Sequence, residues 1–409
     1  MYIERHCEQA IKRMEKNFSA VLVTGMRQVG KTTMLQKIHP DMNYVTLDDL
    51  KILQSAKEDP SLFFEVYKPP VIVDEVQYAP DLFPYVKMKS DRNRKKGMFF
   101  MTGSQSFHLM KNVSESMAGR VGIIQLAGLS LREINNVRYY DNFLPTGKHI
   151  DAMSKLSIEP DYWMIMHTIH KGSFPALYES ETNDKEWNDF YTAYFRTYIE
   201  RDVRQLTQIG DATAFMKFMQ VAAASTGQLL NYSTISKSIG KDVTTIQRWM
   251  SVLEASGIIY ILPPYHKNVT KRVVKTPKLY FLDSGLVCYL TGWNTTEQMA
   301  LSTRAGAIFE SYAFSEILKS FYNDGNSKPP LYFYRDSDGN EIDIVIENGS
   351  FLHPIEVKLS GTPNKSDIKS FGYLEQIDGM KKGEGCIVCM SKEPLFLSRD
   401  DRVVPITYL

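Results

Sequence analysis

The sequence predicts an α/β protein, in which a parallel sheet is followed by a winged helix-turn-helix and then by a C-terminal α/β domain. Three observations carry this prediction. Short apolar runs in the first third of the chain end in polar residues, which is typical of buried parallel strands. Two segments with helical spacing in the middle of the chain are separated by a glycine. Three segments of strand-like composition follow near the C-terminus, with turn-forming residues between them.

The composition is that of an ordinary globular protein with more than one domain. The 409 residues exceed what one hydrophobic core usually supports, so two or three domains are expected. No uncharged apolar run is long enough to span a bilayer, and the N-terminus is charged throughout, so we expect a cytoplasmic protein without a membrane partner. Four scattered cysteines fit a reducing compartment. Cys386 and Cys389 lie in an apolar run that predicts a buried strand, with a metal or redox role as the alternative.

A glycine-rich segment near the N-terminus predicts a phosphate-binding loop. The apolar strand Val21–Val23 leads into GMRQVGKT, which matches G-x-x-x-x-G-K-S/T at every position. The glycines let backbone N–H groups turn around a phosphate, and the following helix and Lys31 add positive charge. A chance glycine-rich turn is the alternative. We expect the nucleotide to be bound by Gly25, Gln28, Val29, Gly30, Lys31, Thr32 and Thr33.

A second strand is expected to bring carboxylates to this loop. The run Pro69–Val73 is apolar or prolyl and leads directly into Asp74 and Glu75. At the carboxyl end of a buried parallel strand, Asp74 is placed to hold a magnesium ion together with Thr32, and Glu75 to polarise an attacking water. A solvated strand end is the alternative for the same residues.

Two further segments predict residues near the phosphates. The strand Met98–Met101 ends in Thr102 and Ser104, either of which could touch the γ-phosphate or the attacking water, unless Ser104 only caps the next helix. Arg120 precedes another short strand, where it could act as an arginine finger in cis or from a neighbouring subunit. A surface salt bridge is the alternative for Arg120.

Residues 1 to about 135 resemble an AAA-type P-loop ATPase module, and the resemblance is carried by GMRQVGKT and VIVDE. It implies ATP and Mg²⁺ as cofactors. It also implies that Asp74 and Glu75 serve magnesium binding and hydrolysis, that Ser104 is the sensor, and that Arg120 sits where a finger could lie. A helical lid with its own sensor arginine is not apparent directly after this core.

The middle of the chain predicts a winged helix-turn-helix. A short helix from Tyr232, a turn at Gly240 and a second helix opening at Asp242 are followed by a strand over 257–262. Residues 233–280 hold eight Lys or Arg against two acids, which favours contacts with DNA phosphates. A protein-interaction module is the alternative. The expected DNA contacts are Thr244, Thr245, Gln247, Arg248, Lys271 and Arg272.

The C-terminal region predicts a metal-dependent nuclease site. Asp343 lies on one expected strand, and Glu356 and Lys358 lie two residues apart on the next, so that both face one side. The two carboxylates would hold magnesium and the lysine would orient the nucleophile, with Glu310 as a further ligand. A sheet edge with ordinary alternating charges is the alternative.

Residues from about 300 to 409 resemble the PD-(D/E)xK nuclease superfamily, which implies a restriction-endonuclease-like fold, although Ile342 stands where that family has its proline. The whole chain resembles a group of prokaryotic ATPases in which an AAA-type module precedes a C-terminal domain of unknown function. The motifs that carry this resemblance are RTYIERDVRQL, KLYFLDSGL and EIDIVIE with PIEVK.

These observations predict an order of domains and a function. We expect an ATPase over 1–135, a linker with helices over 136–210, a winged helix over 211–280 and a nuclease-like domain over 281–409. The expected function is magnesium-dependent ATP hydrolysis coupled to DNA binding, with DNA cleavage as a further activity. The alternatives are a nucleotide-switched regulator or scaffold with an inactive nuclease-like domain, and an ATPase that remodels a protein partner. A homo-oligomer is compatible with each.

Overall fold

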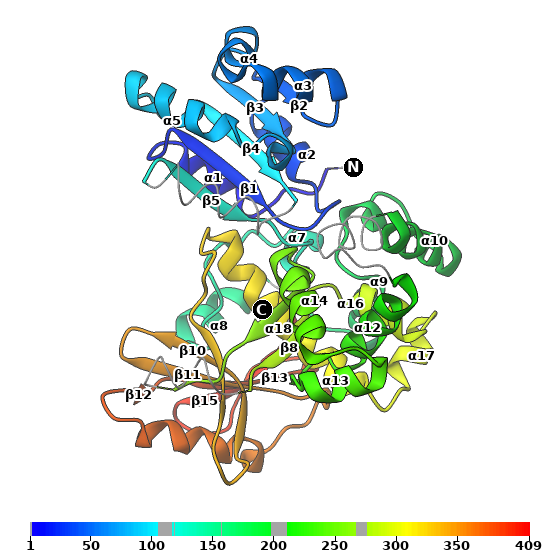
Figure 1. The fold of residues 1–409 in the computed structure, drawn as a ribbon. Helices are drawn as coiled ribbons and strands as arrows, with labels where there is room; N and C mark the ends of the chain where they lie inside the picture. The colour runs from blue at the N-terminus through cyan, green and yellow to red at the C-terminus, as the bar shows by residue number, and fades with distance from the viewer. Residues whose placement is uncertain (1, 105–116, 118, 157, 198–210, 267–275) are drawn as a thin grey trace. The chain divides into compact units, whose positions relative to one another are not determined.

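A computed structural model describes residues 2–104, 117, 119–156, 158–197, 211–266 and 276–409 (Figure 1). The chain divides into two compact units. The first unit comprises Met1–Leu129, Ala255–Gly257 and Phe321–Ser327. The second unit comprises Ser130–Glu254, Ile258–Ser320 and Lys328–Leu409.

The first unit is built on a five-stranded sheet in which every paired strand is parallel, with the order β2-β3-β4-β1-β5. The predicted α/β class with a parallel sheet is therefore confirmed. Because β4 lies between β3 and β1, the carboxyl ends of these three strands meet at one edge, where ligands of such sheets bind. The strands are β1 (Ala20–Thr24), β2 (Asn43–Thr46), β3 (Val71–Asp74), β4 (Phe99–Gly103) and β5 (Val121–Gln125).

Short helices surround this sheet. Asp49 caps α3 by accepting hydrogen bonds from two backbone amides, and Asp59 does the same for α4, which begins with a proline. Alternate residues of β1, β3 and β4 pack with Phe63, Phe64 and Phe83 into one buried cluster. The helices are α1 (Glu8–Met14), α2 (Lys31–Ile38), α3 (Leu50–Glu58), α4 (Pro60–Val66), the 3₁₀ turn η1 (Val76–Tyr78) and α5 (Leu82–Asn93).

The second unit begins with helices. Two of them, α8 and α9, lie in the range 136–210, for which the sequence predicts a linker with helices. Asp161 caps α9, and Ile165 and Ile169 bury one face of it, so a short amphipathic helix forms there. The described helices between residues 130 and 256 are α7 (Leu131–Ile134), α8 (Gly147–Met153), α9 (Tyr162–Lys171), the 3₁₀ turn η2 (Pro175–Tyr178), α10 (Asp184–Tyr194), α12 (Ala212–Ala224), α13 (Tyr232–Ile239) and α14 (Val243–Ala255).

A small antiparallel sheet, β6-β8-β7, combines one strand that precedes α13 with two strands that follow α14. Its strands are β6 (Gln228–Leu229), β7 (Ile259–Leu262) and β8 (Lys278–Phe281). The chain beyond β7 pairs with the larger C-terminal sheet, because Pro264 and Phe333 form a parallel bridge and Tyr265 N donates to Phe333 O over 2.6 Å. This bridge ties the small sheet to the larger one.

The C-terminal sheet is mixed and has the order β14-β15-β13-β11-β10-β9, with β12 paired to β11. Its strands are β9 (Leu331–Arg335), β10 (Glu341–Asn348), β11 (Phe351–Val357), β12 (Lys381–Lys382), β13 (Gly385–Cys389), β14 (Leu395–Phe396) and β15 (Asp401–Pro405). The predicted buried strand at Cys386 and Cys389 is confirmed as β13, in which both thiols are free and buried. The remaining helical segments are α16 (Ser284–Thr291), α17 (Thr296–Ala300), α18 (Ala305–Asn323), η4 (Lys365–Gln376) and η5 (Ile406–Tyr408).

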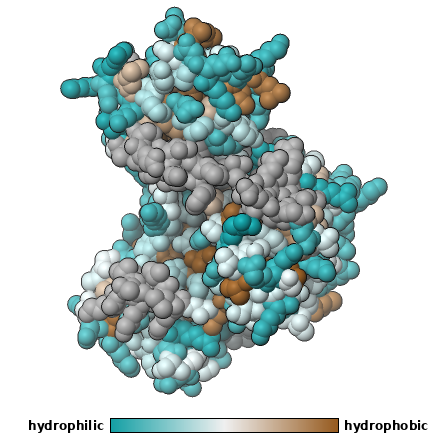
Figure 2. Space-filling model, in the orientation of Figure 1, coloured by the Kyte–Doolittle hydropathy of each residue, from teal (hydrophilic) through white to brown (hydrophobic). Residues whose placement is uncertain are grey.

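The visible surface is largely hydrophilic or intermediate in hydropathy, with scattered apolar side chains (Figure 2). Exposed apolar residues in the first unit include Leu50, Leu62 and Val66 of α3 and α4. Within the described ranges, no helix combines the length and hydropathy needed to cross a bilayer.

Candidate functional site

The predicted phosphate-binding loop connects β1 to the start of α2. Gly25 has a φ of +143°, and a Cβ there would lie 2.0 Å from the carbonyl oxygen of Leu126, so only glycine fits. Gly30, at the N-cap of α2, has a φ of +90°. These two glycines let the loop turn sharply into the helix, whose first backbone N–H groups have no partner within the helix. The loop and the helix therefore form an anion-binding geometry.

Lys31 directs its ammonium group into the loop. Its Nζ donates to the carbonyl oxygens of Gly25 and Met26 over 3.0 and 2.7 Å. Burial lowers the pKa of Lys31 to about 8, although the carboxylates of Glu75 and Asp74 oppose this shift. A positive charge thus lies where the sequence predicts a phosphate.

Asp74, at the end of β3, is hydrogen-bonded through both carboxylate oxygens. Thr32 Oγ1 donates to Oδ1 over 2.7 Å, and the Thr102 hydroxyl donates to the same oxygen. Tyr44 OH donates to Oδ2 over 3.0 Å. The two predicted magnesium ligands, Thr32 and Asp74, are therefore brought together.

Tyr44 was missed by sequence reasoning. It lies on β2 opposite Ile72 of β3, so its long side chain reaches the end of the neighbouring strand. The only available signal was an aromatic hydroxyl in the strand-like run NYVT.

Glu75 has the left-handed backbone conformation, with a φ of 57°. Its amide donates to Thr102 Oγ1 over 3.1 Å, which fixes the turn after β3. Its carboxylate accepts from the Gln77 side chain and from Ser104 Oγ, the latter over 3.3 Å. Ser104 and Glu75 are therefore neighbours, and Gln77 is a further residue of this site that sequence reasoning missed.

A buried arginine holds the loop from behind. Arg5 NH1 donates to the carbonyl oxygen of Val29 over 2.7 Å, and NH2 donates to those of Ala127 and Gly128 over 2.8 and 3.2 Å. Arg5 is 3% exposed. An isolated arginine near the N-terminus gave no sequence signal for this contact. Two other predicted loop residues, Gln28 and Thr33, are exposed.

Arg120 forms an ion pair with Asp91, with 2.6 Å between Nε and Oδ1. Both side chains are partly exposed. This contact is the surface salt bridge that the sequence analysis gave as the alternative to an arginine finger.

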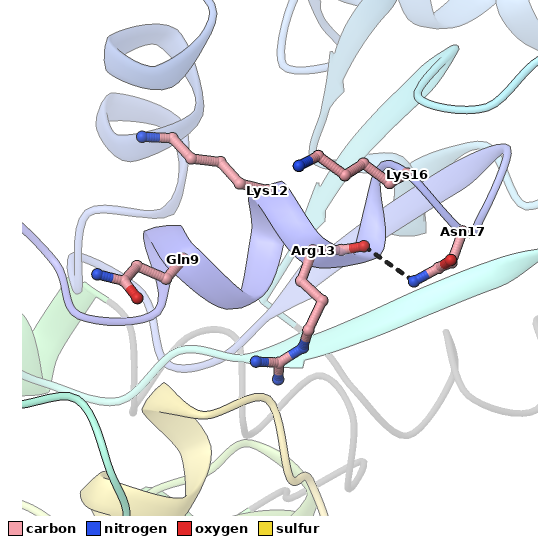
Figure 3. A pocket seen from close by; sticks show the side chains of 5 residues that line it. All are labelled: Gln9, Lys12, Arg13, Lys16 and Asn17. Atoms are coloured by element: carbon pink, nitrogen blue, oxygen red, sulfur yellow. Dashed lines mark hydrogen bonds between the residues drawn. The ribbon is translucent and has the colours of Figure 1, made fainter.

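A hollow along α1 and the turn after it contains none of the predicted site residues (Figure 3). It is lined by Gln9, Lys12, Arg13, Lys16 and Asn17.

In the second unit, α13 and α14 are joined by a tight turn in which Gly240 has a φ of +71°. Asp242 caps α14: its carboxylate accepts from Thr245 N over 2.8 Å and from Thr245 Oγ1 over 2.7 Å. Thr244, Gln247 and Arg248 are exposed near the start of α14. The predicted contacts Lys271 and Arg272 lie outside the described residues.

The four predicted nuclease-site residues lie in one cluster of the second unit. Lys358 Nζ donates to Glu356 Oε2 over 3.0 Å, and Asp343 Oδ2 accepts from Val357 N over 3.0 Å. Burial, the charge of Asp343 and a hydrogen bond with it raise the pKa of Glu356 well above its usual range. Burial and the same charge also raise the pKa of Glu310, which accepts from Tyr280 OH over 2.6 Å.

Lys278 of β8 lies among these carboxylates and was missed by sequence reasoning. Its Nζ is 2.6 Å from Glu341 Oε1, 3.2 Å from Glu310 Oε1 and 3.4 Å from Asp343 Oδ1. Burial alone would lower the pKa of Lys278, but the three carboxylates outweigh it and raise the pKa. The only sequence signal was a lysine at the start of the apolar run KLYFL.

These carboxylates do not fit a divalent cation, because the Lys278 ammonium group lies among them. Across the described ranges, no group of three or more His, Cys, Asp or Glu side chains is arranged to hold a metal ion. The P-loop site differs, since the oxygens of Thr32 and Asp74 converge there and Mg²⁺ commonly takes only one or two protein ligands besides phosphate oxygens.

Three family models match parts of the chain. Residues 17–135 match a model described as an AAA domain, which supports the predicted AAA-type P-loop ATPase module. Residues 164–297 and 305–409 match two models that are each described as a domain of unknown function, DUF8612 and DUF4143.

Similar proteins extend over most of the chain. The uncharacterized protein Rv2008c of Mycobacterium tuberculosis is 27% identical over 370 residues, covering 90% of this chain and 76% of that protein. The uncharacterized protein MJ1637 of Methanocaldococcus jannaschii is 23% identical over 399 residues, covering 89% and 80%. Among solved structures, a Walker-type ATPase of Pyrococcus abyssi is similar at 12% identity and a TM-score of 0.39, over 71% of this chain and 96% of that one.

Proposed function

We propose that the first unit binds ATP with Mg²⁺ and hydrolyses it. The observation that carries the proposal is the hydrogen bond of 2.7 Å between Thr32 and Asp74, beside the buried Lys31. This hydrogen bond joins the first turn of α2 to the end of β3. Binding of Mg²⁺ with the nucleotide phosphates requires oxygen ligands next to a phosphate-binding helix terminus, and the two elements supply them. The AAA-domain match over residues 17–135 supports the same proposal.

Each residue has a role in this proposal. Lys31 and the N–H groups of the loop bind the phosphates, and Thr32 and Asp74 hold the ion. Mg²⁺, when bound, neutralises charge on the phosphates. Glu75 polarises the attacking water. Ser104 donates to the Glu75 carboxylate over 3.3 Å and so helps to orient that carboxylate.

We propose further that the second unit engages DNA through α14, and that this contact depends on the nucleotide bound to the first unit. The support is the exposed set Thr244, Gln247 and Arg248 at the start of α14, together with the basic excess of residues 233–280. The regulator or scaffold with an inactive nuclease-like domain is the second candidate. Lys278 favours it over DNA cleavage, because its ammonium group is 3.4 Å or less from three carboxylates.

Phosphate release from the full chain tests the ATPase proposal. Lys31→Ala should lose nucleotide binding, whereas Glu75→Gln should bind ATP and fail to turn it over. Lys51→Ala and Glu65→Gln, which change exposed side chains of α3 and α4, are matched controls and should behave like the wild type. If Lys31→Ala and Glu75→Gln both keep turnover, the site assignment is wrong.

The same assay with duplex DNA separates the two candidate functions. Stimulation of phosphate release by DNA supports the coupling, and a response to a protein partner but not to DNA supports the regulator or scaffold. Divalent-dependent DNA cleavage that is abolished by Asp343→Ala would contradict an inactive nuclease-like domain.

A further inference from the structure

The strand β8 carries a lysine into an almost closed, acidic environment. Lys278 pairs with Leu262 of β7 and Leu229 of β6, so its backbone is fixed on both sides. Its side chain is only 3% exposed, and Nζ lies 5.7 Å from the centre of the Phe333 ring. A buried ammonium group is tolerated only where partners compensate for its lost hydration.

The partners come from two different elements. Glu310 belongs to α18, whereas Glu341 and Asp343 belong to β10, where they point to one side because they are two residues apart. Asp343 lies where the pairing of β10 with β9 shifts register, between Ile342 and Val345. Such irregularities redirect side chains, and here Asp343 reaches both Lys278 and the amide of Val357.

Cationic side chains of the protein itself compensate the carboxyl groups of the cluster. The carboxyl groups are those of Glu310, Glu341, Asp343 and Glu356, and the cations are Lys278, Lys358 and Arg335, which is 3.0 Å from Glu341. Glu356 Oε2 accepts from Lys358 Nζ over 3.0 Å, so each of the four carboxyl groups lies within 3.4 Å of a lysine ammonium group.

A divalent cation at these carboxylates would lie next to the Lys278 ammonium group. The repulsion would be strong, because few water molecules could screen two cations in so buried a place. The ammonium group has little access to solvent, since the Lys278 side chain is only 3% exposed and its backbone is held between two strands.

We infer that Lys278 takes the place of a divalent cation in this cluster, so that the carboxylates form a metal-free, ion-paired joint between β8, α18 and β10. Lys278 is thus a positioning residue that holds the small sheet to the C-terminal sheet. The inference is independent of the ATPase proposal, because it concerns residues of the second unit alone.

A titration of the nucleotide-free full chain with Mn²⁺ tests this inference. Electron paramagnetic resonance measures the free ion, and the missing signal gives the bound ion. We compare the wild type with Lys278→Met and Lys278→Gln, each with and without Asp343→Asn. Lys382→Met is the matched control, because Lys382 is also a shielded, ion-paired lysine of the second unit but contacts one carboxylate, that of Asp401, over 2.6 Å. Circular dichroism identifies the variants that fold.

The wild type should show no Mn²⁺ binding that depends on Asp343. A folded Lys278→Met or Lys278→Gln protein should gain a site at least about tenfold tighter than any wild-type site, because it frees several carboxylates for the ion. Asp343→Asn should abolish that gain, and Lys382→Met should show none.

Two results would overturn the inference. One is stoichiometric Mn²⁺ binding by the wild type that Asp343→Asn removes, a measurement that needs no Lys278 variant to fold. The other is a folded Lys278→Gln or Lys278→Met protein that gains no Mn²⁺ site.

Discussion

Thr32 Oγ1 donates to Asp74 Oδ1 over 2.7 Å, which joins the phosphate-binding loop directly to the end of β3. The two residues are 42 positions apart in the chain. Their meeting follows from the strand order, since only β4 separates β3 from β1. The same carboxylate is also held by Thr102 and Tyr44, so its position is set by three hydroxyl groups.

Asp74→Asn should strongly reduce the contribution of Mg²⁺ to ATP affinity. The amide can still accept from Thr32 through its oxygen, so the loop should fold, but it lacks the negative charge that attracts the ion. We expect ATP affinity in EDTA to be nearly unchanged and the gain on adding Mg²⁺ to fall by about tenfold or more. Calorimetric titration measures both affinities.

Asp48→Asn is the control for this substitution, because Asp48 is exposed and follows β2 in the same unit. It should retain the full effect of Mg²⁺. An equal loss in both variants would mean that Asp74 has no special part in binding the ion.

Local sequence patterns predicted the features of the chain that a few consecutive residues define. The loop at Gly25–Thr32, the strand that ends at Asp74 and the turn at Gly240 each follow from backbone preferences and burial periodicity over a short window. The parallel sheet follows from the same strands. These features depend little on which distant segment packs against them.

The missed residues are contacts between distant segments. Tyr44, Arg5 and Lys278 meet their partners only because strand register and helix packing bring those segments together. Arg120 illustrates the same limit, because its partner Asp91 lies near the end of α5, 29 positions away. A pattern of residue types cannot choose between a finger and a salt bridge when the choice depends on such a neighbour.

His149 should make the stability of the second unit depend on pH. Burial, followed by the nearby charge of Arg132, lowers the pKa of His149 from 6.5 to about 4, although a hydrogen bond with the carbonyl oxygen of Tyr408 opposes this. Nε2 lies 2.9 Å from that oxygen, and Nδ1 is buried without a partner. A second proton would therefore have no acceptor.

The sign follows from comparing the folded and unfolded chains. In the unfolded chain His149 takes up a proton below pH 6.5, whereas in the folded chain it stays neutral until the pH nears 4. The contribution of His149 to the free energy of unfolding is therefore fully present above pH 6.5 and is lost as the pH falls toward 4. At pH 5 the loss should be about 2 kcal/mol. Urea unfolding gives the free energy of unfolding at pH 7.5 and at pH 5. His149→Gln should remove the His149 contribution from the difference between these two values. An unchanged pH dependence would contradict the account.

Gly285→Ala should destabilise the second unit. A Cβ at Gly285 would lie 2.1 Å from the hydroxyl oxygen of Tyr191, which donates to Asp283 Oδ1 over 2.7 Å. Asp283 is buried and also caps α16 by accepting from Leu286 N over 2.7 Å. We expect a loss of about 3 kcal/mol from crowding and the broken hydrogen bond.

Gly306→Ala is the control for Gly285→Ala, because a Cβ at Gly306 in α18 meets nothing within 4 Å. It should be neutral or stabilise by up to about 1 kcal/mol, since alanine favours helices. Thermal unfolding of the two variants measures the contrast. Equal effects would show that the space beside Tyr191 does not require glycine.

Arg248→Ala should weaken binding to duplex DNA if α14 lies against the phosphates. Arg248 is exposed near the start of α14, while Ile246, Trp249 and Met250 bury the opposite face, so removing the arginine should leave the helix packed. We expect a loss of about tenfold in affinity and a reduction of the salt dependence by about one counterion, similar for different DNA sequences. Fluorescence anisotropy at several salt concentrations measures the affinity and its salt dependence.

Lys217→Ala is the control, because it removes the same charge from an exposed position on α12. It should change neither the affinity nor its salt dependence. Equal losses in the two variants would point to net charge rather than to α14, and no loss in either would favour the regulator or scaffold.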